Sequence, residues 1–252
     1  MDKMQTARQF TYPPSNYRDE LKQSNPLWYF WLPIASIVAI FLARALFIEW
    51  TKVWLFSEER GLVEFIHFLF PALVALIGLR LLFFPQIRKD PLLLLWALAL
   101  AVGGIYLSGE EASWGQHYFA WATPESWKLV NDQGETNLHN TSRFFDQLPR
   151  AFLVAGIIFA GLIMTWILSN RPELPPRRFD ILYPALALRT LAACVLFSEF
   201  YLQAKDLFFL IIAASNMPRP GEIQETYLVW FLLYYALLIY WRAHSLHQPG
   251  KC

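Results

Sequence analysis

Six long apolar segments constrain this chain more than any other feature. They cover residues 27–48, 61–84, 91–109, 150–169, 180–200 and 224–241. A helix needs about 20 mostly apolar residues to cross a bilayer, and lipid forces every backbone polar group to be paired within the segment. The alternating ten-residue segments typical of a membrane barrel are absent from the sequence. We therefore expect an all-α, polytopic membrane bundle of about six transmembrane helices.

The charge content agrees with this expectation. Only 16% of the 252 residues are charged, whereas about 25% is usual in soluble domains. The formal net charge of +1 gives no basic excess of the kind that nucleic-acid binding requires. Cys194 and Cys252 are too few for a disulfide scaffold or a multi-thiolate metal site. We expect membrane lipids as partners, and no nucleic acid.

Loop charges predict the orientation. Cationic residues gather in the N-terminal tail, the 85–90 turn, the 170–179 loop and the C-terminal tail. The positive-inside rule then places both termini in the cytoplasm and loops 49–60, 110–149 and 201–223 outside. The expected divisions are a cytoplasmic tail (1–26), a six-helix transmembrane domain (27–241) with its long outer loop (110–149), and a second cytoplasmic tail (242–252). Residues 207–214 are apolar but too short to span, which favours an interfacial or re-entrant helix.

The long outer loop is expected to contain short interfacial helices. Thr123 before Pro124 is typical of a helix start, with the threonine as cap and the proline in the first turn. The resulting helix, 124–130, would rest in the membrane interface through Trp127, Leu129 and Val130.

Acids and histidines collect at the outer level of this topology. Charged groups near hydrocarbon are costly, and inside a bundle they pair or serve a function. Arg44, in the outer half of the first span, could neutralise the carboxylates. The sequence therefore predicts a polar site at the outer face, drawn from Glu64, His67, Glu110, Glu111, His117, Glu135, His139, Glu199, Asp206, Glu222 and Glu225.

Spacing suggests a metal site. Glu64 and His67 form a Glu-x-x-His pair and Glu135 and His139 a Glu-x-x-x-His pair, spacings that share one helix face. If the helix continues past Gly109, the residues Glu110, Ser113, Trp114 and His117 also share a face. Imidazole with carboxylate suits zinc, our first expectation, with iron or manganese as alternatives. The predicted metal ligands are His67, His117, His139, Glu64 and Glu111, and the predicted catalytic residues are Glu110, Glu135 and Ser113.

Each of these residues also has a plain structural interpretation. Asp132 to Glu135 fits a capping box at a helix start, and Ser108 to Glu111 allows the same interpretation. His67 could be a core histidine hydrogen-bonded to a carbonyl group. The polar segment 131–140 could be an ordinary solvated loop. The whole cluster could be an ion-pair network without a metal.

Two stretches carry a resemblance. Glu110-Glu-Ala-Ser-Trp-Gly-Gln116 and Gln133-Gly-Glu-Thr-Asn-Leu-His-Asn140 resemble signatures in a group of uncharacterised bacterial multi-pass inner-membrane proteins. The resemblance implies a bacterial inner membrane. The Ser113-x-x-x-His117 spacing is similar to one element of alkaline ceramidase-like membrane metallohydrolases. Those have seven spans and a late His-x-x-x-His pair, where this chain has a Glu-x-x-x-His pair in a loop, so this similarity is an analogy only.

The leading hypothesis is a metal-dependent membrane hydrolase or transferase acting on a lipid or lipid-linked substrate. A carboxylate would act as general base toward metal-bound water. One alternative is a transporter or ion-coupled carrier that uses buried carboxylates and Arg44. A second is a non-catalytic assembly or sensor subunit that docks through the 110–149 loop. Haem ligation by two histidines is a further possibility.

Overall fold

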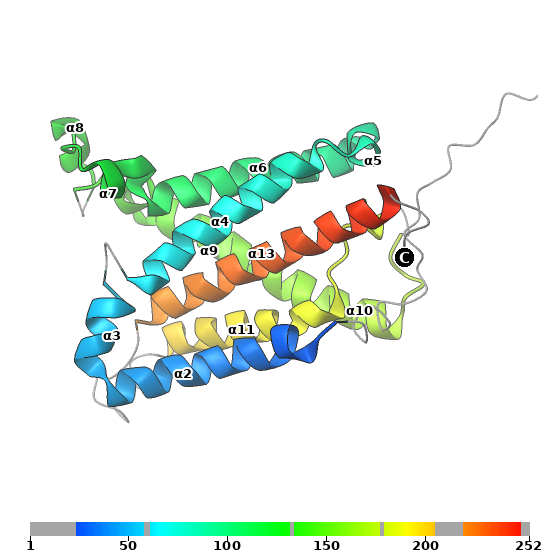
Figure 1. Cartoon of the computed structure of the whole chain (residues 1–252), viewed down its shortest axis with the longest axis horizontal. Coiled ribbons are helices and arrows are strands. Elements are labelled where there is room, and N and C mark those ends of the chain that lie inside the picture. The colour runs from blue at the N-terminus through cyan, green and yellow to red at the C-terminus, as the bar shows by residue number, and fades with distance from the viewer. Residues whose placement is uncertain (1–23, 58–60, 132–133, 177–178, 205–218, 248–252) are drawn as a thin grey trace, which may run out of the picture.

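The chain folds into an antiparallel bundle of membrane-length helices. The computed structural model describes residues 24–57, 61–131, 134–176, 179–204 and 219–247, and no strand occurs among them. Consecutive long helices run in opposite directions (Figure 1). The chain is therefore an all-α multi-pass membrane protein, which confirms the predicted fold class. Six helical segments are long and apolar enough to cross a membrane: Leu27–Leu46, Leu62–Leu81, Pro91–Glu111, Phe144–Asn170, Leu186–Gln203 and Pro220–Leu246.

Several spans are built from more than one helical element. The π-helical turn η1 (Leu27–Trp31) leads into α2 (Leu32–Leu46), and α9 (Arg143–Ile158) continues through η4 (Phe159–Met164) into α10 (Thr165–Asn170). The turn η6 (Leu186–Leu188) precedes α11 (Arg189–Gln203). The remaining long helices are α4 (Leu62–Leu81), α6 (Pro91–Glu111) and α13 (Pro220–His247). The short elements are α3 (Ile48–Trp54), α5 (Pro85–Lys89), η2 (Ser113–Gly115), α7 (Gln116–Phe119), α8 (Glu125–Lys128) and η3 (His139–Thr141).

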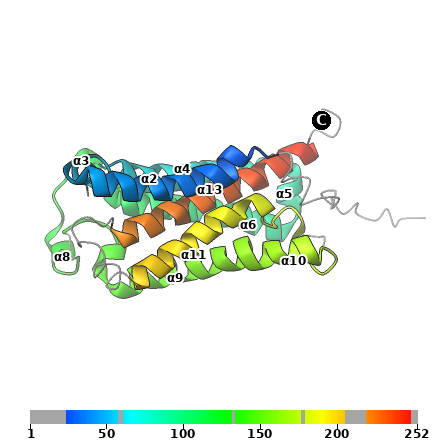
Figure 2. The same ribbon diagram turned by 90° about the horizontal axis from the view of Figure 1, so that it is seen from below.

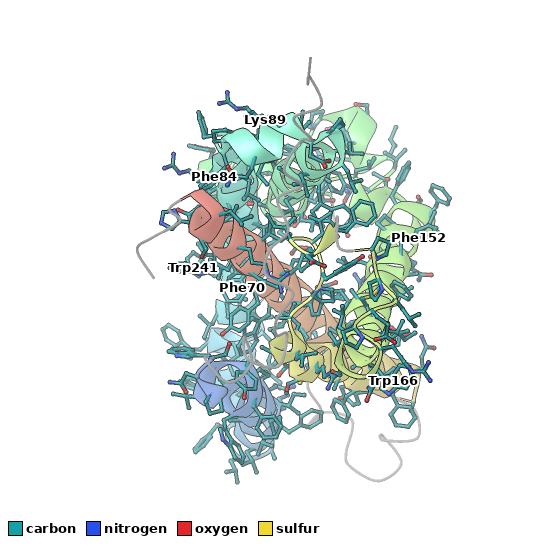
Figure 3. All side chains as sticks on the ribbon, turned by 90° about the vertical axis from the view of Figure 1, so that its right-hand side faces the viewer. Phe70, Phe84, Lys89, Phe152, Trp166 and Trp241 are labelled. Carbon is teal, nitrogen blue, oxygen red and sulfur yellow. The ribbon has the colours of Figure 1, made fainter. Side chains whose placement is uncertain are left out.

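Helix α13 is the centre of the bundle. It packs against α4, α9 and α11, whereas α6 packs chiefly on α4 and α2 packs on α11. The views from below and along the bundle show the other long helices arranged around it (Figures 2 and 3). More of α13 is buried than of any other span. A helix that is apolar on all sides suits this central position.

Small residues bring α4 and α6 into backbone contact. A Cβ atom on Gly104 would stand 2.5 Å from the backbone nitrogen of Ala75 and 2.6 Å from the carbonyl oxygen of Pro71. Lipid supplies little hydrophobic drive between helices, so close van der Waals contact through small residues stabilises such pairs. This contact fixes the relative position of the two helices whose ends reach the site described below.

The outer surface of the bundle is apolar. Leu76 is 61% exposed, Val102 64% and Phe152 71%, each in the interior of a span. Figure 3 shows Phe152 and Trp166 on the rim of the bundle. Large exposed apolar surfaces are unfavourable in water and are typical of a lipid-facing protein.

Two arginines away from the site, the half-buried Arg44 and the buried Arg242, have structural partners. Arg44 donates to the carbonyl oxygen of Ile48 at 3.2 Å and to Thr51 Oγ1 at 3.1 Å, across the break between α2 and α3. Arg242 donates to the carbonyl oxygens of Asp180 and Ile181 at the opposite end of the bundle. Such bonds satisfy both the guanidinium group and the carbonyl groups at helix ends.

Two spans are longer than the apolar runs suggested. The fourth begins at Arg143 rather than 150, with the Ser142 side chain accepting a hydrogen bond from the Phe145 amide. The last runs from Pro220 to His247 rather than from 224 to 241. Both extensions are polar turns that hydropathy does not detect. The expected element at residues 207–214 lies outside the described residues.

Candidate metal centre

A cavity of about 580 Å³ opens at one end of the bundle. It lies where α4 and α13 begin, α6 ends and α9 begins, on the left of Figure 1. Seven carboxylates and two arginines line it, which is an unusual concentration for a chain with so few charges. The polar lining residues are Glu64, His67, Tyr106, Glu110, Glu111, Glu135, Asn137, Asn140, Asp146, Arg150, Arg219, Glu222 and Glu225, and the apolar ones are Pro71, Leu107, Phe145, Pro149, Leu153, Leu228 and Val229.

Two packed helices supply the centre of the cavity. Glu64 and His67 lie three residues apart in the first turns of α4, and Glu222 and Glu225 have the same spacing in the first turns of α13. Residues at this spacing share a helix face. Because α4 and α13 pack together, the two pairs meet. Glu111 reaches the same point from the last residue of α6.

The hydrogen bonds around His67 fix its tautomer. Its Nε2 atom lies 2.9 Å from Thr226 Oγ1, and that hydroxyl donates its own hydrogen to the Glu222 carbonyl oxygen at 2.8 Å. The hydroxyl oxygen must therefore accept from Nε2–H. In a neutral imidazole the other ring nitrogen then carries a lone pair. A histidine that binds a metal through one ring nitrogen usually donates a hydrogen bond from the N–H of the other, which fixes the tautomer and the orientation of the ring.

His67 Nδ1 points into a ring of carboxylates. The side chain is 1% exposed. Nδ1 lies 3.5 Å from Glu225 Oε2, 3.9 Å from Glu222 Oε2 and 4.0 Å from Glu111 Oε2. Within the described part of the chain, it has no hydrogen-bond partner. A buried nitrogen facing only acceptor oxygens requires a proton or a cation between them.

The ligand atoms are close enough for one ion. Glu64, His67 and Glu111 offer donor atoms within 4.8 Å of one another, and so do His67, Glu222 and Glu225. The two sets share the imidazole. Metal–ligand distances near 2.0–2.2 Å place the donors of a single ion about 3–4 Å apart. The set of one nitrogen and several carboxylate oxygens suits manganese, iron or zinc.

Two arginines balance part of the negative charge. Arg150 Nη2 lies 2.8 Å from Asp146 Oδ1 and also pairs with Glu225 Oε1. Arg219 Nη1 lies 3.8 Å from Glu222 Oε1. With two guanidinium groups against seven carboxylates, the cavity still needs further cations or bound protons to approach neutrality.

Glu110 fastens the outer loop to the end of α6. Its Oε1 accepts from Trp114 Nε1 and its Oε2 from the Leu138 amide, both at 2.7 Å. The helix ends at Glu111, and Ser113, Trp114 and Gly115 follow with φ angles of 45°, 54° and 105°. The predicted continuation of one helical face from Glu110 to His117 is therefore wrong. The left-handed turn instead folds Trp114 back onto Glu110.

Ser113 and Glu135 join the same network. Ser113 Oγ donates to Glu135 Oε2 at 2.7 Å, and Asn137 Nδ2 donates to both Ser113 Oγ and Glu135 Oε2, at 3.0 and 2.6 Å. Thr136 binds Gln116 through its amide at 2.8 Å. The segments 110–116 and 134–140 are thus joined by hydrogen bonds between their side chains and backbone. Residues 134–138 are not helical, so Glu135 does not belong to the start of a helix and the capping-box interpretation is wrong.

The start of the short loop helix also differs from expectation. Helix α8 covers Glu125–Lys128, and its cap position is Pro124 without a side-chain cap. Thr123 instead donates to the Gly134 carbonyl and accepts from Gln116 Nε2 at 2.7 Å. The threonine therefore joins the loop network rather than capping a helix. Leu129, 86% exposed, and Val130 present the apolar surface expected at a membrane interface.

The predicted site residues thus divide into four groups. Glu64, His67 and Glu111 come together. Glu110 and Glu135 line the cavity, and with Ser113 they hold the loop. The side chains of His117 and His139, together with Asp206, lie outside the described residues. Glu199 belongs to another cluster, where it accepts from Gln203 Nε2 at 2.9 Å and from Gln224 Nε2.

Sequence reasoning placed Glu222 and Glu225 at the outer level but not among the ligands. Their spacing of three residues, identical to that of Glu64 and His67, was the feature of the sequence that could have identified them as ligands. Asp146 was missed because the polar first turns of α9 lay within the expected loop, and Arg150 because it was the first residue of the expected span 150–169. Arg219 precedes α13 by one residue and carries no signal of its own.

Comparisons with family models, with curated proteins and with solved structures find no match for this chain. The geometry of the cavity therefore carries the functional argument.

Proposed function

We propose that the protein is a metal-dependent membrane hydrolase or transferase that acts on a lipid or lipid-linked substrate. His67 Nδ1 would bind one divalent ion together with carboxylates of Glu111, Glu222 and Glu225. The observation that carries this proposal is the buried Nδ1 atom, which faces three carboxylates and has no hydrogen-bond partner in the described residues. The hydroxyl of Thr226 fixes the tautomer that a ligand requires.

The donor set favours manganese or iron. A site with one imidazole and several carboxylates offers harder ligand atoms, mostly oxygen, than the histidine- and cysteine-rich sites typical of zinc. Such an ion lowers the pKa of its bound water and polarises a carbonyl or phosphoryl oxygen. Zinc remains a weaker candidate on the same ligands.

The remaining carboxylate, Glu64, is the proposed general base. It lies one turn before His67 on α4, with a carboxylate oxygen within 4.8 Å of the ligand atoms of His67 and Glu111. In the proposed step, Glu64 accepts a proton from water while the water oxygen bonds to the electrophilic carbon or phosphorus of an ester. The ester bond to the leaving alcohol breaks, and the proton passes to the alcohol oxygen.

The position of the cavity supports a lipid-like substrate. It opens at the level of the first helical turns, and half of its wall is apolar, including Phe145, Leu153 and Val229. An amphiphile, which has a polar head and an apolar chain, matches a cavity wall that is partly polar and partly apolar. The cation-rich segments meet the other end of the bundle, so we propose that the cavity faces away from the cytoplasm of a bacterial inner membrane.

Metal content tests the proposal. Full-length protein in detergent is loaded with Mn²⁺, dialysed and analysed for metals. We expect about one ion per chain, lost in His67→Ala and in the more conservative His67→Gln. His244→Ala is the matched control, because His244 lies at the opposite end of the bundle, against Tyr240.

The competing interpretation is a protonated His67 paired with Glu225. It predicts no stoichiometric ion in the wild type after loading with Mn²⁺, Fe²⁺ or Zn²⁺. That result would refute the metal site even if every variant folds.

A further inference from the structure

The cavity carries two cationic side chains beside the proposed ion. Arg150 projects from α9, and Arg219 precedes the first turn of α13. Both line the same cavity as His67. The side chain of Arg219 is 54% exposed, so it is accessible to a ligand that enters.

The guanidinium of Arg150 is arranged so that one edge meets the carboxylates. A single nitrogen, Nη2, makes the ion pairs with Asp146 and Glu225. The second nitrogen, Nη1, lies 3.7 Å from the point where a Cβ atom on Gly221 would stand. This is an ordinary contact distance, so Arg150 Nη1 lies beside the start of α13.

An apolar wall adjoins these cations. Phe145, Pro149 and Leu153 of α9 line the cavity. The next lipid-facing residue of that helix, Phe152, is 71% exposed and lies on the rim of the bundle (Figure 3). Helix α9 packs on α11 and α13, whereas α6 packs chiefly on α4. The cavity therefore lies where α9 and α13 meet the ends of α4 and α6.

We infer that the cavity binds the phosphoryl group of an anionic amphiphile between the proposed metal ion and the guanidinium groups of Arg150 and Arg219, with the apolar chain along α9. This inference rests on the proposed function and specifies its substrate class. Guanidinium groups bind phosphoryl oxygens through paired N–H donors, and a metal ion neutralises the remaining charge. A neutral lipid offers no phosphoryl oxygens to these donors or to the ion, so the site would select the phosphorylated form.

Binding to Mn²⁺-loaded full-length protein in detergent tests the inference. The probes are dioleoyl phosphatidic acid, dioleoylglycerol as the neutral counterpart, and inorganic phosphate as competitor. We expect phosphatidic acid to bind at least tenfold more tightly than dioleoylglycerol, and inorganic phosphate to compete only at higher concentration.

The decisive variant is Arg219→Gln, and Arg150→Lys is the second. We expect Arg219→Gln to weaken phosphatidic acid binding at least tenfold while the Mn²⁺ content stays at the wild-type value. Arg80→Gln is the matched control, because Arg80 is an exposed arginine in the last turn of α4.

Each failure has a distinct meaning. Equal binding of phosphatidic acid by Arg219→Gln and Arg80→Gln would overturn the inference, and so would equal binding of dioleoylglycerol. Inorganic phosphate binding as tightly as the lipid would support the phosphoryl site and overturn its lipid source. A wild type that binds none of Mn²⁺, Fe²⁺ and Zn²⁺ would refute the proposed function, whatever the lipid result.

Discussion

Two polar clusters lie side by side at one end of the bundle, and they differ in how their hydrogen bonds are satisfied. The loop network of Glu110, Ser113, Glu135 and Asn137 has donors matched to acceptors at 2.6 to 3.0 Å. The cluster around His67 instead places carboxylate oxygens 3.5 to 4.0 Å from the buried Nδ1 atom of that histidine.

The difference separates a structural role from a binding role. A matched network stabilises one conformation and has no need of a ligand, whereas a buried nitrogen without a hydrogen-bond partner in the described residues, as at His67 Nδ1, is costly unless something binds it. From sequence spacing alone, the predicted catalytic residues belong to the loop network, and some of the predicted metal ligands belong to the cluster around His67. The following substitutions test whether the two clusters are distinct.

The largest effect is expected at Glu64. Glu64→Gln keeps the size of the side chain but cannot accept a proton, so turnover of a phosphorylated lipid should fall about 10²- to 10⁴-fold. Metal content should stay near the wild-type value. Hydrolysis measured beside metal analysis tests this, and a variant with normal turnover would remove Glu64 from the chemistry.

Glu110→Ala should destabilise the fold rather than the metal site. The substitution leaves Trp114 Nε1 and the Leu138 amide without their acceptor, at a cost of about 2–4 kcal/mol. Unfolding in denaturant should show the loss, while Mn²⁺ affinity changes less than it does in His67→Gln. If Mn²⁺ binding disappears with the fold intact, the two clusters are one site.

Thr226→Val removes the hydroxyl that orients His67 and nearly preserves the volume. Loss of such a support should weaken Mn²⁺ binding about 10- to 100-fold, or about 1.4–2.7 kcal/mol. Titration followed by electron paramagnetic resonance measures the affinity. An unchanged affinity would show that the hydrogen bond between His67 and Thr226 does not support metal binding.

Glu49→Gln is expected to have the smallest effect. Glu49 is exposed and pairs with Lys52 at 2.9 Å on α3, and such surface pairs contribute about 0–1 kcal/mol. Stability, metal content and lipid binding should all match the wild type. A loss of Mn²⁺ in this variant would show that acidic charge at this end of the bundle, rather than the His67 geometry, governs binding.

Part of the site could be predicted from local spacing. Glu64 and His67 share a face of α4 because they are three residues apart in a helix, and hydropathy identified that helix. Hydropathy likewise identified the helix that ends near Glu111, which places that residue at the same outer level of the membrane as Glu64 and His67. Contacts between helices follow no such periodicity. Glu222 and Glu225 were predicted at the outer level, but only the packing of α13 on α4 makes them candidate metal ligands.

The outer loop shows where local rules were insufficient. The capping interpretations of Thr123 and Glu135 rest on backbone preferences within a few residues. Long-range bonds from Gln116 to Thr123 and from Ser113 to Glu135 replace them in the structure. The left-handed backbone at Ser113 and Trp114 turns the loop onto itself, and no spacing rule indicates this for residues other than glycine.

The sequence by itself determined a multi-pass helical bundle and the level at which its charges lie. Both follow from the cost of unpaired backbone groups and charges in hydrocarbon, which acts on each segment separately. Only the tertiary structure decided which charges meet and which are already satisfied. The tautomer of His67, the carboxylates around Nδ1 and the arginines beside them depend on the packing of four helices, because ångström-scale distances between side chains arise only when distant segments come together.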